Sequence, residues 1–126
     1  MTTVARVVAI VPAMNSPVVG ETVRALGSTG RVAEVLVIDD ASTDDTGDRA
    51  AAAGAIVITP AFNLGKGDAV ALGVRNAPDA TVYLLVDADL GATAAHVVEL
   101  ADLVLVDRAD LVVAAFPPAA GRESTR

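Results

Sequence analysis

The chain has 126 residues, a formal net charge of −7 and no cysteine, and these properties exclude several classes of protein. A chain of this length forms a single domain with a core of its own. The acidic charge argues against a nucleic-acid partner, which requires a basic surface. The absence of cysteine excludes disulfides, thiolate metal ligands and a cysteine nucleophile.

Five short apolar runs predict β-strands, at residues 6–13, 32–40, 55–61, 81–89 and 109–116. The runs are continuous and do not alternate with polar residues, which is typical of strands that are covered on both faces. Helices are predicted between them, at residues 16–30, 43–54, 66–78 and 93–105. This alternation predicts an α/β fold, an open and mainly parallel sheet with helices on both faces in three layers.

Two helices carry specific expectations. Ser16 is a suitable N-cap for the first helix, and Pro17 a suitable first helical residue. In the third helix, Val70, Val74 and Ala77 lie on one side and predict the face that packs on the sheet.

The N-terminal residues predict a strand and not a secretion signal. Residues 1–17 contain one arginine, Pro12 interrupts their apolar run, and no small-residue cleavage site follows. No window approaches the roughly 18 apolar residues of a membrane span. We therefore expect a cytoplasmic protein without a transmembrane segment, with one domain at residues 1–117 and a flexible tail at residues 118–126.

Polar residues gather where the predicted strands end. Ligands of open α/β sheets bind outside the carboxyl ends of the strands, so side chains at these positions are candidates for a binding site. Four successive strands bring to this edge Asn15, Asp39, Asp40, Asn63, Lys66, Asp87 and Asp89.

The fourth strand ends in two aspartates, Asp87 and Asp89, with only Ala88 between them. Two carboxylates ~4–5 Å apart repel each other by several kcal/mol at an effective dielectric constant of ~20, unless protonation, water or a cation relieves the repulsion. Oxygen ligands of this kind favour Mg²⁺ or Mn²⁺, and the small Ala88 leaves room for a diphosphate. The alternative is that the aspartates begin a loop and cap the next helix.

Lys66 stands between Gly65 and Gly67. Glycine allows a ligand to approach the backbone closely, and a lysine at that point can contact a phosphate or a base carbonyl. The alternative is a glycine-rich turn with a solvated lysine. The sequence has neither a Walker loop nor the glycine fingerprint of dinucleotide-binding proteins, which disfavours an oxidoreductase.

Four segments together resemble the motifs of family 2 glycosyltransferases of the GT-A fold. They are "VPAMN", "IDDASTDDT", "NLGKGDA" and "DAD", and they occur in the family's order and at about its spacing within residues ~7–92. The resemblance implies a Rossmann-like GT-A domain that binds a UDP- or GDP-sugar for transfer to an acceptor.

The resemblance also implies roles for single residues. Pro12, Ala13 and Asn15 would line the nucleotide pocket, and Asp39 and Asp40 would accept hydrogen bonds from the base or ribose. Lys66 would contact the base or diphosphate, and Asn63 and Ala88 complete the predicted nucleotide-sugar site. Asp87 and Asp89 would bind the nucleotide sugar through Mg²⁺ or Mn²⁺, with Asp89 as the direct ligand.

The chain departs from the family pattern in two residues and in length. Ser16 stands in place of the family's glutamate, and Ala41 in place of its glycine. Family members continue for another hundred residues or more, which supply the acceptor site and, in inverting enzymes, the catalytic carboxylate. We therefore expect the donor-binding half of such an enzyme and assign no catalytic residue.

Two other functions and one property follow from the same residues. The same pocket without transfer would make the chain a non-catalytic remnant or partner subunit. A sugar-phosphate nucleotidyltransferase is disfavoured, because no glycine-rich basic loop follows the first strand. An incomplete sheet edge would expose apolar surface, so we also expect self-association.

Overall fold

The computed structural model describes residues 6–96, 98–99 and 111–113. Along the chain the elements are β1 (Val7–Ala13), α1 (Val19–Ser28), β2 (Glu34–Asp39), α2 (Thr46–Ala52), β3 (Ile56–Ile58), α3 (Lys66–Arg75), β4 (Val82–Leu85), the 3₁₀-helix η1 (Ala88–Thr93) and β5 (Leu111–Val113). The predicted tail at residues 118–126 lies outside the described residues.

The five described strands form one parallel sheet in the order β3-β2-β1-β4-β5. This confirms the predicted open parallel sheet. The chain first builds outward from β1 through β2 to β3, and then returns to place β4 on the other side of β1. The order of strands therefore reverses between β1 and β4, and in α/β sheets such a reversal marks the crevice where ligands bind.

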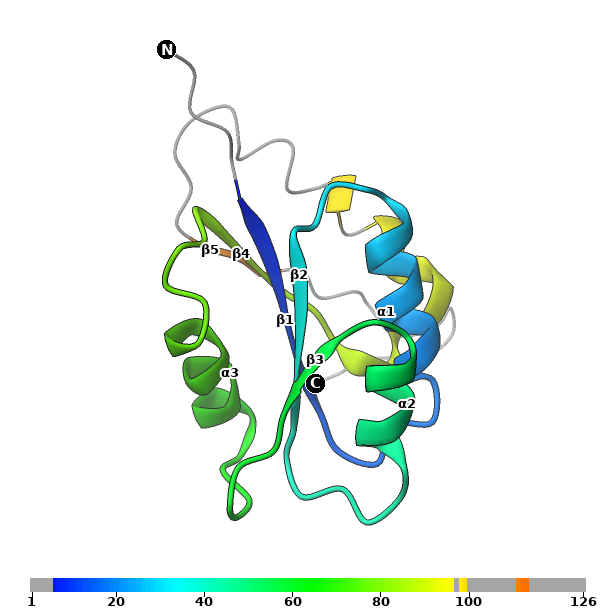
Figure 1. The fold of residues 1–126 in the computed structure, drawn as a ribbon, viewed down its shortest axis with the longest axis vertical. Helices are drawn as coiled ribbons and strands as arrows, with labels where there is room; N and C mark the ends of the chain where they lie inside the picture. The colour runs from blue at the N-terminus through cyan, green and yellow to red at the C-terminus, as the bar shows by residue number, and fades with distance from the viewer. Residues whose placement is uncertain (1–5, 97, 100–110, 114–126) are drawn as a thin grey trace, which may run out of the picture.

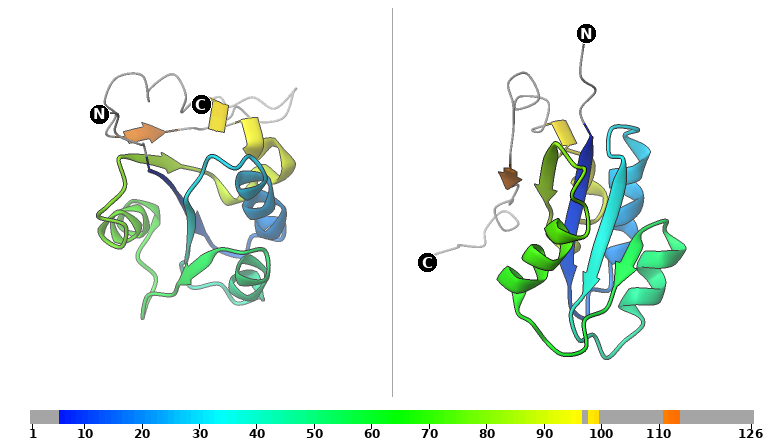
Figure 2. Two further views of the ribbon diagram at one scale, coloured as in Figure 1. Left: turned by 45° about the horizontal axis from the view of Figure 1, so that its top comes forward. Right: turned by 60° about the vertical axis from the view of Figure 1, so that its left-hand side comes forward.

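Helices cover both faces of the sheet, as predicted, with α1 and α2 on one face and α3 on the other (Figures 1 and 2). The strand β1 shows how one segment serves both layers. Val7, Ala9 and Val11 belong to the core beneath α1, and Val8 and Ile10 belong to the core beneath α3. Both faces of β1 are buried, which explains its continuous apolar sequence.

Two predicted boundaries are wrong. Helix α1 begins at Val19 with Val18 as its N-cap, and Ser16 does not cap it. The Ser16 hydroxyl donates instead to Asp89, far along the chain. The fourth strand ends at Leu85 and not at Asp89, because the chain turns and residues 88–93 form η1.

The packing face of α3 also differs from the prediction. The residues that α3 buries are Ala69 and Gly73, whereas Val70 and Val74 are only half-buried. Ala77, which follows the helix, is buried as expected. Small residues at the contact allow the helix backbone to approach the sheet closely. A Cβ atom built on Gly73 would lie 2.6 Å from Cγ2 of Ile10.

The strand β3 forms one edge of the sheet and exposes Ile56. An exposed apolar edge is consistent with self-association, which stays a prediction. None of the helices within the described residues has the length and apolar character needed to cross a membrane.

The contact at Gly73 gives a test of the packing. We expect Gly73→Ala to lower the free energy of unfolding by about 1–3 kcal/mol, because the new methyl group displaces the buried, β-branched Ile10. Urea unfolding measures the change. The control is Gly27→Ala in α1, where nothing lies within 4 Å of the new Cβ. There alanine should stabilise the helix by up to about 1 kcal/mol, and equal effects at both sites would contradict the close contact.

Candidate functional site

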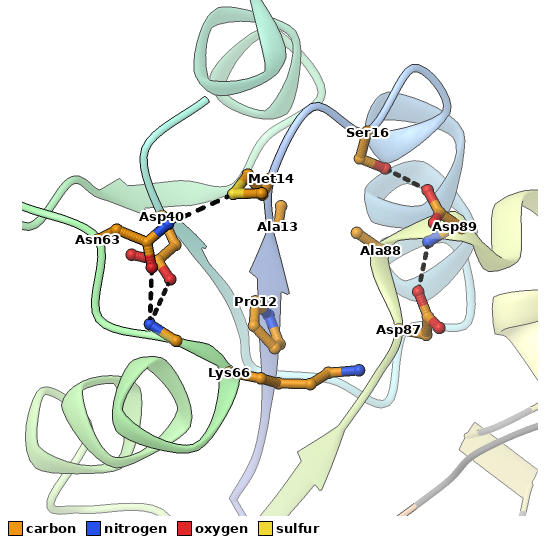
Figure 3. A pocket seen from close by; sticks show the side chains of 11 residues that line it. Pro12, Ala13, Met14, Ser16, Asp40, Asn63, Lys66, Asp87, Ala88 and Asp89 are labelled. Carbon is orange, nitrogen blue, oxygen red and sulfur yellow. Dashed lines mark hydrogen bonds between the residues drawn. The ribbon is translucent and has the colours of Figure 1, made fainter. Parts of the chain in front are cut away.

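A cavity of about 360 Å³ opens where β1, β2 and β4 end, at the reversal of strand order. Its volume is within the range of small-molecule sites. The cavity is lined by Pro12, Ala13, Met14, Ser16, Asp40, Asn63, Gly65, Lys66, Asp87, Ala88 and Asp89 (Figure 3).

The structure brings together all of the predicted site residues except Asn15 and Asp39. Three residues of the lining were not predicted as site residues, Met14, Ser16 and Gly65. Each is an immediate neighbour in sequence of a predicted site residue. The signal that could have found them is this adjacency, because a loop that passes a cavity presents more than one residue to it.

The acidic end of the cavity carries Asp87 and Asp89. The Asp89 backbone N–H donates to Oδ1 of Asp87 at 2.9 Å, and the Ser16 hydroxyl donates to Oδ1 of Asp89 at 2.7 Å (Figure 3). Asp87 is thereby the N-cap of η1. The capping role that the sequence left open is therefore real for Asp87, and its carboxylate nevertheless lines the cavity.

The two aspartates fit part of a ligand set for a divalent metal. Each uses Oδ1 in a hydrogen bond with the chain, and no donor among the described residues is bonded to either Oδ2. No group of three or more acidic or histidine residues in the described part of the chain is placed to hold a metal alone. Mg²⁺ is usually bound by one or two carboxylates, with water and substrate phosphates in its other positions. The residues fit that arrangement.

Asp40, at the end of β2, fixes the opposite side of the cavity. Its side chain is buried, with 6% of the residue exposed. Oδ1 accepts the Leu64 N–H at 2.7 Å, and Oδ2 accepts the Gly65 N–H at 2.9 Å. Asp40 therefore holds the loop that leads into α3, and it sets the position of Lys66, the exposed first residue of that helix.

Asn15 braces two loops beside the cavity but does not line it. Its side-chain oxygen accepts the Thr43 N–H at 2.8 Å, and its own N–H donates to the Ser42 hydroxyl at 2.9 Å. Its φ of 49° lies in the left-handed region, which asparagine tolerates better than most residues. Asn15 thus ties the end of β1 to the loop that follows β2.

Asp39 points away from the cavity, although it is the neighbour of Asp40. Successive residues at the end of a strand point to opposite faces of the sheet. Asp39 lies against α2 and lines a second cavity of about 320 Å³, and a Cβ atom on Gly47 would be 2.6 Å from its Oδ2. Its Oδ1 is buried without a hydrogen-bond partner among the described residues.

A chain of hydrogen bonds connects the start of α2 to the cavity. The Ser16 N–H donates to the Thr46 hydroxyl at 2.9 Å, and that hydroxyl donates to Oδ1 of Asp44. The hydroxyl bond, followed by the Thr46 backbone N–H and the charge of Arg49, holds the pKa of Asp44 below its ordinary value. A carboxylate that accepts such bonds is stabilised in its charged form.

Comparison with known proteins gives a family match. The sequence profile described as "Glycosyl transferase family 2" matches residues 8–125. The chain belongs to this family. A sequence comparison with curated proteins gives no match.

Solved structures of glycosyltransferase-type enzymes share this fold. Glucosyl-3-phosphoglycerate synthase from Mycobacterium tuberculosis, in complex with Mn²⁺, UDP-glucose and phosphoglyceric acid, is 28% identical with a TM-score of 0.61, over 70% of this chain and 34% of that one. The same enzyme with Mg²⁺ and UDP is 26% identical over the same 70% and 34%, also with a TM-score of 0.61. A mycobacterial protein is 27% identical with a TM-score of 0.71, over 82% and 38%.

These likenesses confirm the predicted GT-A fold. The chain spans little more than a third of the length of these solved structures.

The departure from the family pattern at Ala41 has a cost in backbone energy. Ala41 stands where the family pattern has glycine, and its φ is 72°. An L-residue in this region carries a backbone cost of roughly 1–2 kcal/mol that glycine avoids. The loop after β2 therefore has a left-handed conformation at Ala41, which glycine would adopt without this cost.

The role of Asp40 can be tested by Asp40→Asn. The amide places an NH₂ group opposite one of the two backbone N–H groups, so one hydrogen bond is lost and two donors face each other. We expect the free energy of unfolding to fall by about 1–3 kcal/mol, with faster amide hydrogen exchange at Leu64 and Gly65. The control is Asp68→Asn in the exposed first turn of α3. Unchanged exchange at both amides would contradict this role.

The lowered pKa of Asp44 predicts a pH dependence. Because the folded-state pKa is below the unfolded one, the charged carboxylate stabilises the fold above the unfolded value of about 3.9. This contribution is lost as the pH falls through the folded pKa. The wild type should therefore lose more stability between about pH 5 and pH 3 than Asp44→Asn does, as measured by urea unfolding. Asp79→Asn, at an exposed loop position, is the control and should follow the wild type.

Proposed function

We propose that this chain binds a nucleotide-diphosphate sugar, UDP- or GDP-linked, as the donor part of a glycosyltransferase that transfers the sugar to an acceptor. The observation that carries the proposal is the composition of the cavity. Two carboxylates lie at one end, an apolar side chain and hydrogen-bonding groups lie at the other, and one lysine lines it as well. A nucleoside diphosphate would complement these groups, with its base at the apolar end and its phosphates, through a metal, at the end with the two carboxylates.

The end of the cavity at β2 suits a nucleobase and its ribose. Met14 offers an apolar surface and is 54% exposed, and a flexible thioether adapts well to an aromatic ring. The Asn63 amide lies within 3.6 Å of the Met14 sulfur. The two oxygens of Asp40 already accept backbone N–H groups, but a carboxylate has about four acceptor sites, so it can also accept from a base or ribose.

The end of the cavity at β4 suits the diphosphate. Asp87 and Asp89 would hold Mg²⁺ or Mn²⁺, an ion that usually takes some of its ligands from substrate phosphates. Ala88 adds no bulk between the two aspartates. The amine of Lys66 extends across the cavity in the direction of Asp87 (Figure 3). There its positive charge, in addition to that of the metal, would meet a phosphate. A bound metal supplies Lewis-acid stabilisation of charge on the departing nucleoside diphosphate.

The solved relatives support this assignment of ligands. The glucosyl-3-phosphoglycerate synthase complexes contain UDP or UDP-glucose with Mn²⁺, and in one case Mg²⁺ with UDP. The identity of these enzymes to this chain is 26–28%, over 70% of its length. We therefore favour a uridine nucleotide over a guanosine nucleotide and assign no acceptor.

Binding without transfer is the second candidate function. The acidic residues of the described cavity lining are Asp40, Asp87 and Asp89. Asp40 is committed to the loop before α3, and the other two are assigned to the metal. No further carboxylate of that lining is left to act as a catalytic base. A chain that binds the donor and leaves the transfer step to other residues would have this lining.

Calorimetry with UDP-glucose and GDP-mannose, each with and without Mn²⁺, tests donor binding. We expect Mn²⁺-dependent binding, and we expect Asp89→Ala to weaken it by roughly 100-fold or more, because loss of an outer-shell partner alone already costs 10–100-fold. Donor hydrolysis in the same samples separates binding from turnover.

The control for this experiment is Asp79→Ala, which removes the same charge at an exposed position outside the cavity. It should bind like the wild type. Equal affinity of Asp89→Ala and wild type, or binding that does not depend on the metal, would contradict the proposed role of the two aspartates.

A further inference from the structure

We infer that Ser16 is a positioning residue that aims the Asp89 carboxylate at the metal. The inference rests on the proposed function and extends it to a residue outside the metal ligands. Ser16 was expected to cap α1, and the structure shows its hydroxyl committed to Asp89 instead.

Burial and backbone hydrogen bonds fix the position of Ser16 independently of its hydroxyl. The residue is 2% exposed. Its backbone N–H donates to the buried Thr46 hydroxyl at 2.9 Å, and its carbonyl accepts the Val19 N–H at 3.3 Å. From this fixed point the hydroxyl donates to Oδ1 of Asp89 at 2.7 Å. A hydrogen bond to a charged oxygen is stronger than a neutral one, so it holds the carboxylate effectively.

The backbone on both sides of Asp89 is fixed by a second hydroxyl, that of Thr22 in α1. Thr22 is fully buried in α1, donates to the Ala88 carbonyl at 2.6 Å and accepts the Gly91 N–H at 2.8 Å. The turn is thus held at the residue before Asp89 and at the second residue after it. What remains free is the rotation of the Asp89 side chain, and Ser16 restrains that rotation.

The identity of residue 16 matters for this role. The family pattern has a glutamate here, and a carboxylate cannot donate to Asp89 and would add a third negative charge at this end of the cavity. A hydroxyl donates, adds no charge, and leaves Oδ2 of Asp89 without a donor among the described residues. Partners of this kind set the orientation of a metal ligand, and their loss typically lowers metal affinity 10–100-fold.

The test is Ser16→Ala in the full chain. The Mn²⁺ dissociation constant is measured in the presence of saturating UDP or GDP by calorimetry and by the Mn²⁺ electron paramagnetic resonance signal. We expect affinity for Mn²⁺ to fall by roughly 10–100-fold, while affinity for UDP or GDP without metal and the thermal midpoint stay close to wild type. Ser16→Thr keeps the hydroxyl and should recover most of the Mn²⁺ affinity.

Ser42→Ala is the matched control. It also removes a loop hydroxyl beside the cavity, one that accepts the Asn15 N–H and does not contact Asp89. Its Mn²⁺ affinity should equal that of the wild type. Wild-type Mn²⁺ affinity in Ser16→Ala would overturn this inference alone. A parallel loss of metal-free nucleotide affinity in Ser16→Ala would show a merely structural role and would overturn it too. Absence of Mn²⁺-dependent binding in the wild type would overturn the proposed function together with it.

Discussion

The parallel pairing of β1 with β2 and with β4 is the constraint on which the cavity depends. The register pairs Ala13 with Asp39 on one side of β1 and Ile10 with Leu85 on the other. Just past each ladder one more backbone bond continues it, from Asp40 N–H to the Ala13 carbonyl and from Val86 N–H to the Ile10 carbonyl. Segments more than 70 residues apart thereby end at one edge, and a slip of one residue in either ladder would turn the acidic side chains to the opposite face.

The strands bring the site residues to one edge, and α1 with its preceding loop fixes how they are held. Thr22 binds the backbone of the turn after β4, and Ser16 binds the carboxylate of Asp89 in that turn. On the other side, Asp40 holds the loop that begins α3. Each wall of the cavity is therefore braced by a polar side chain from a different element. Braces that are buried and satisfied in this way favour one arrangement of the loops, because breaking one leaves an unpaired polar group.

Much of this arrangement could be predicted from the sequence because it depends on local pattern. Continuous apolar runs identify strands covered on both faces, and the edge where parallel strands end follows from their direction. The sequence did not show which of Asp39 and Asp40 lines the cavity. The face of the sheet to which each side chain points depends on the residue at which the strand ends. The sequence also missed the contact between Ser16 and Asp89, because a serine before a helix has the pattern of a cap and its actual partner is 73 residues away.

The two aspartates at the end of β4 are not equivalent, because their carboxylates accept hydrogen bonds from different donors. Asp87 uses one oxygen to cap η1, and Asp89 uses one oxygen to accept from Ser16. A hydrogen-bond donor thus stabilises each carboxylate without changing its charge, and a cation would relieve the repulsion between the two charges. Two carboxylates are too few to hold Mg²⁺ or Mn²⁺ tightly, and without the metal their charge would weaken the binding of a diphosphate. In the proposed complex the metal and the nucleotide therefore complete each other's site, and thermodynamic linkage requires each to raise the affinity for the other by the same factor.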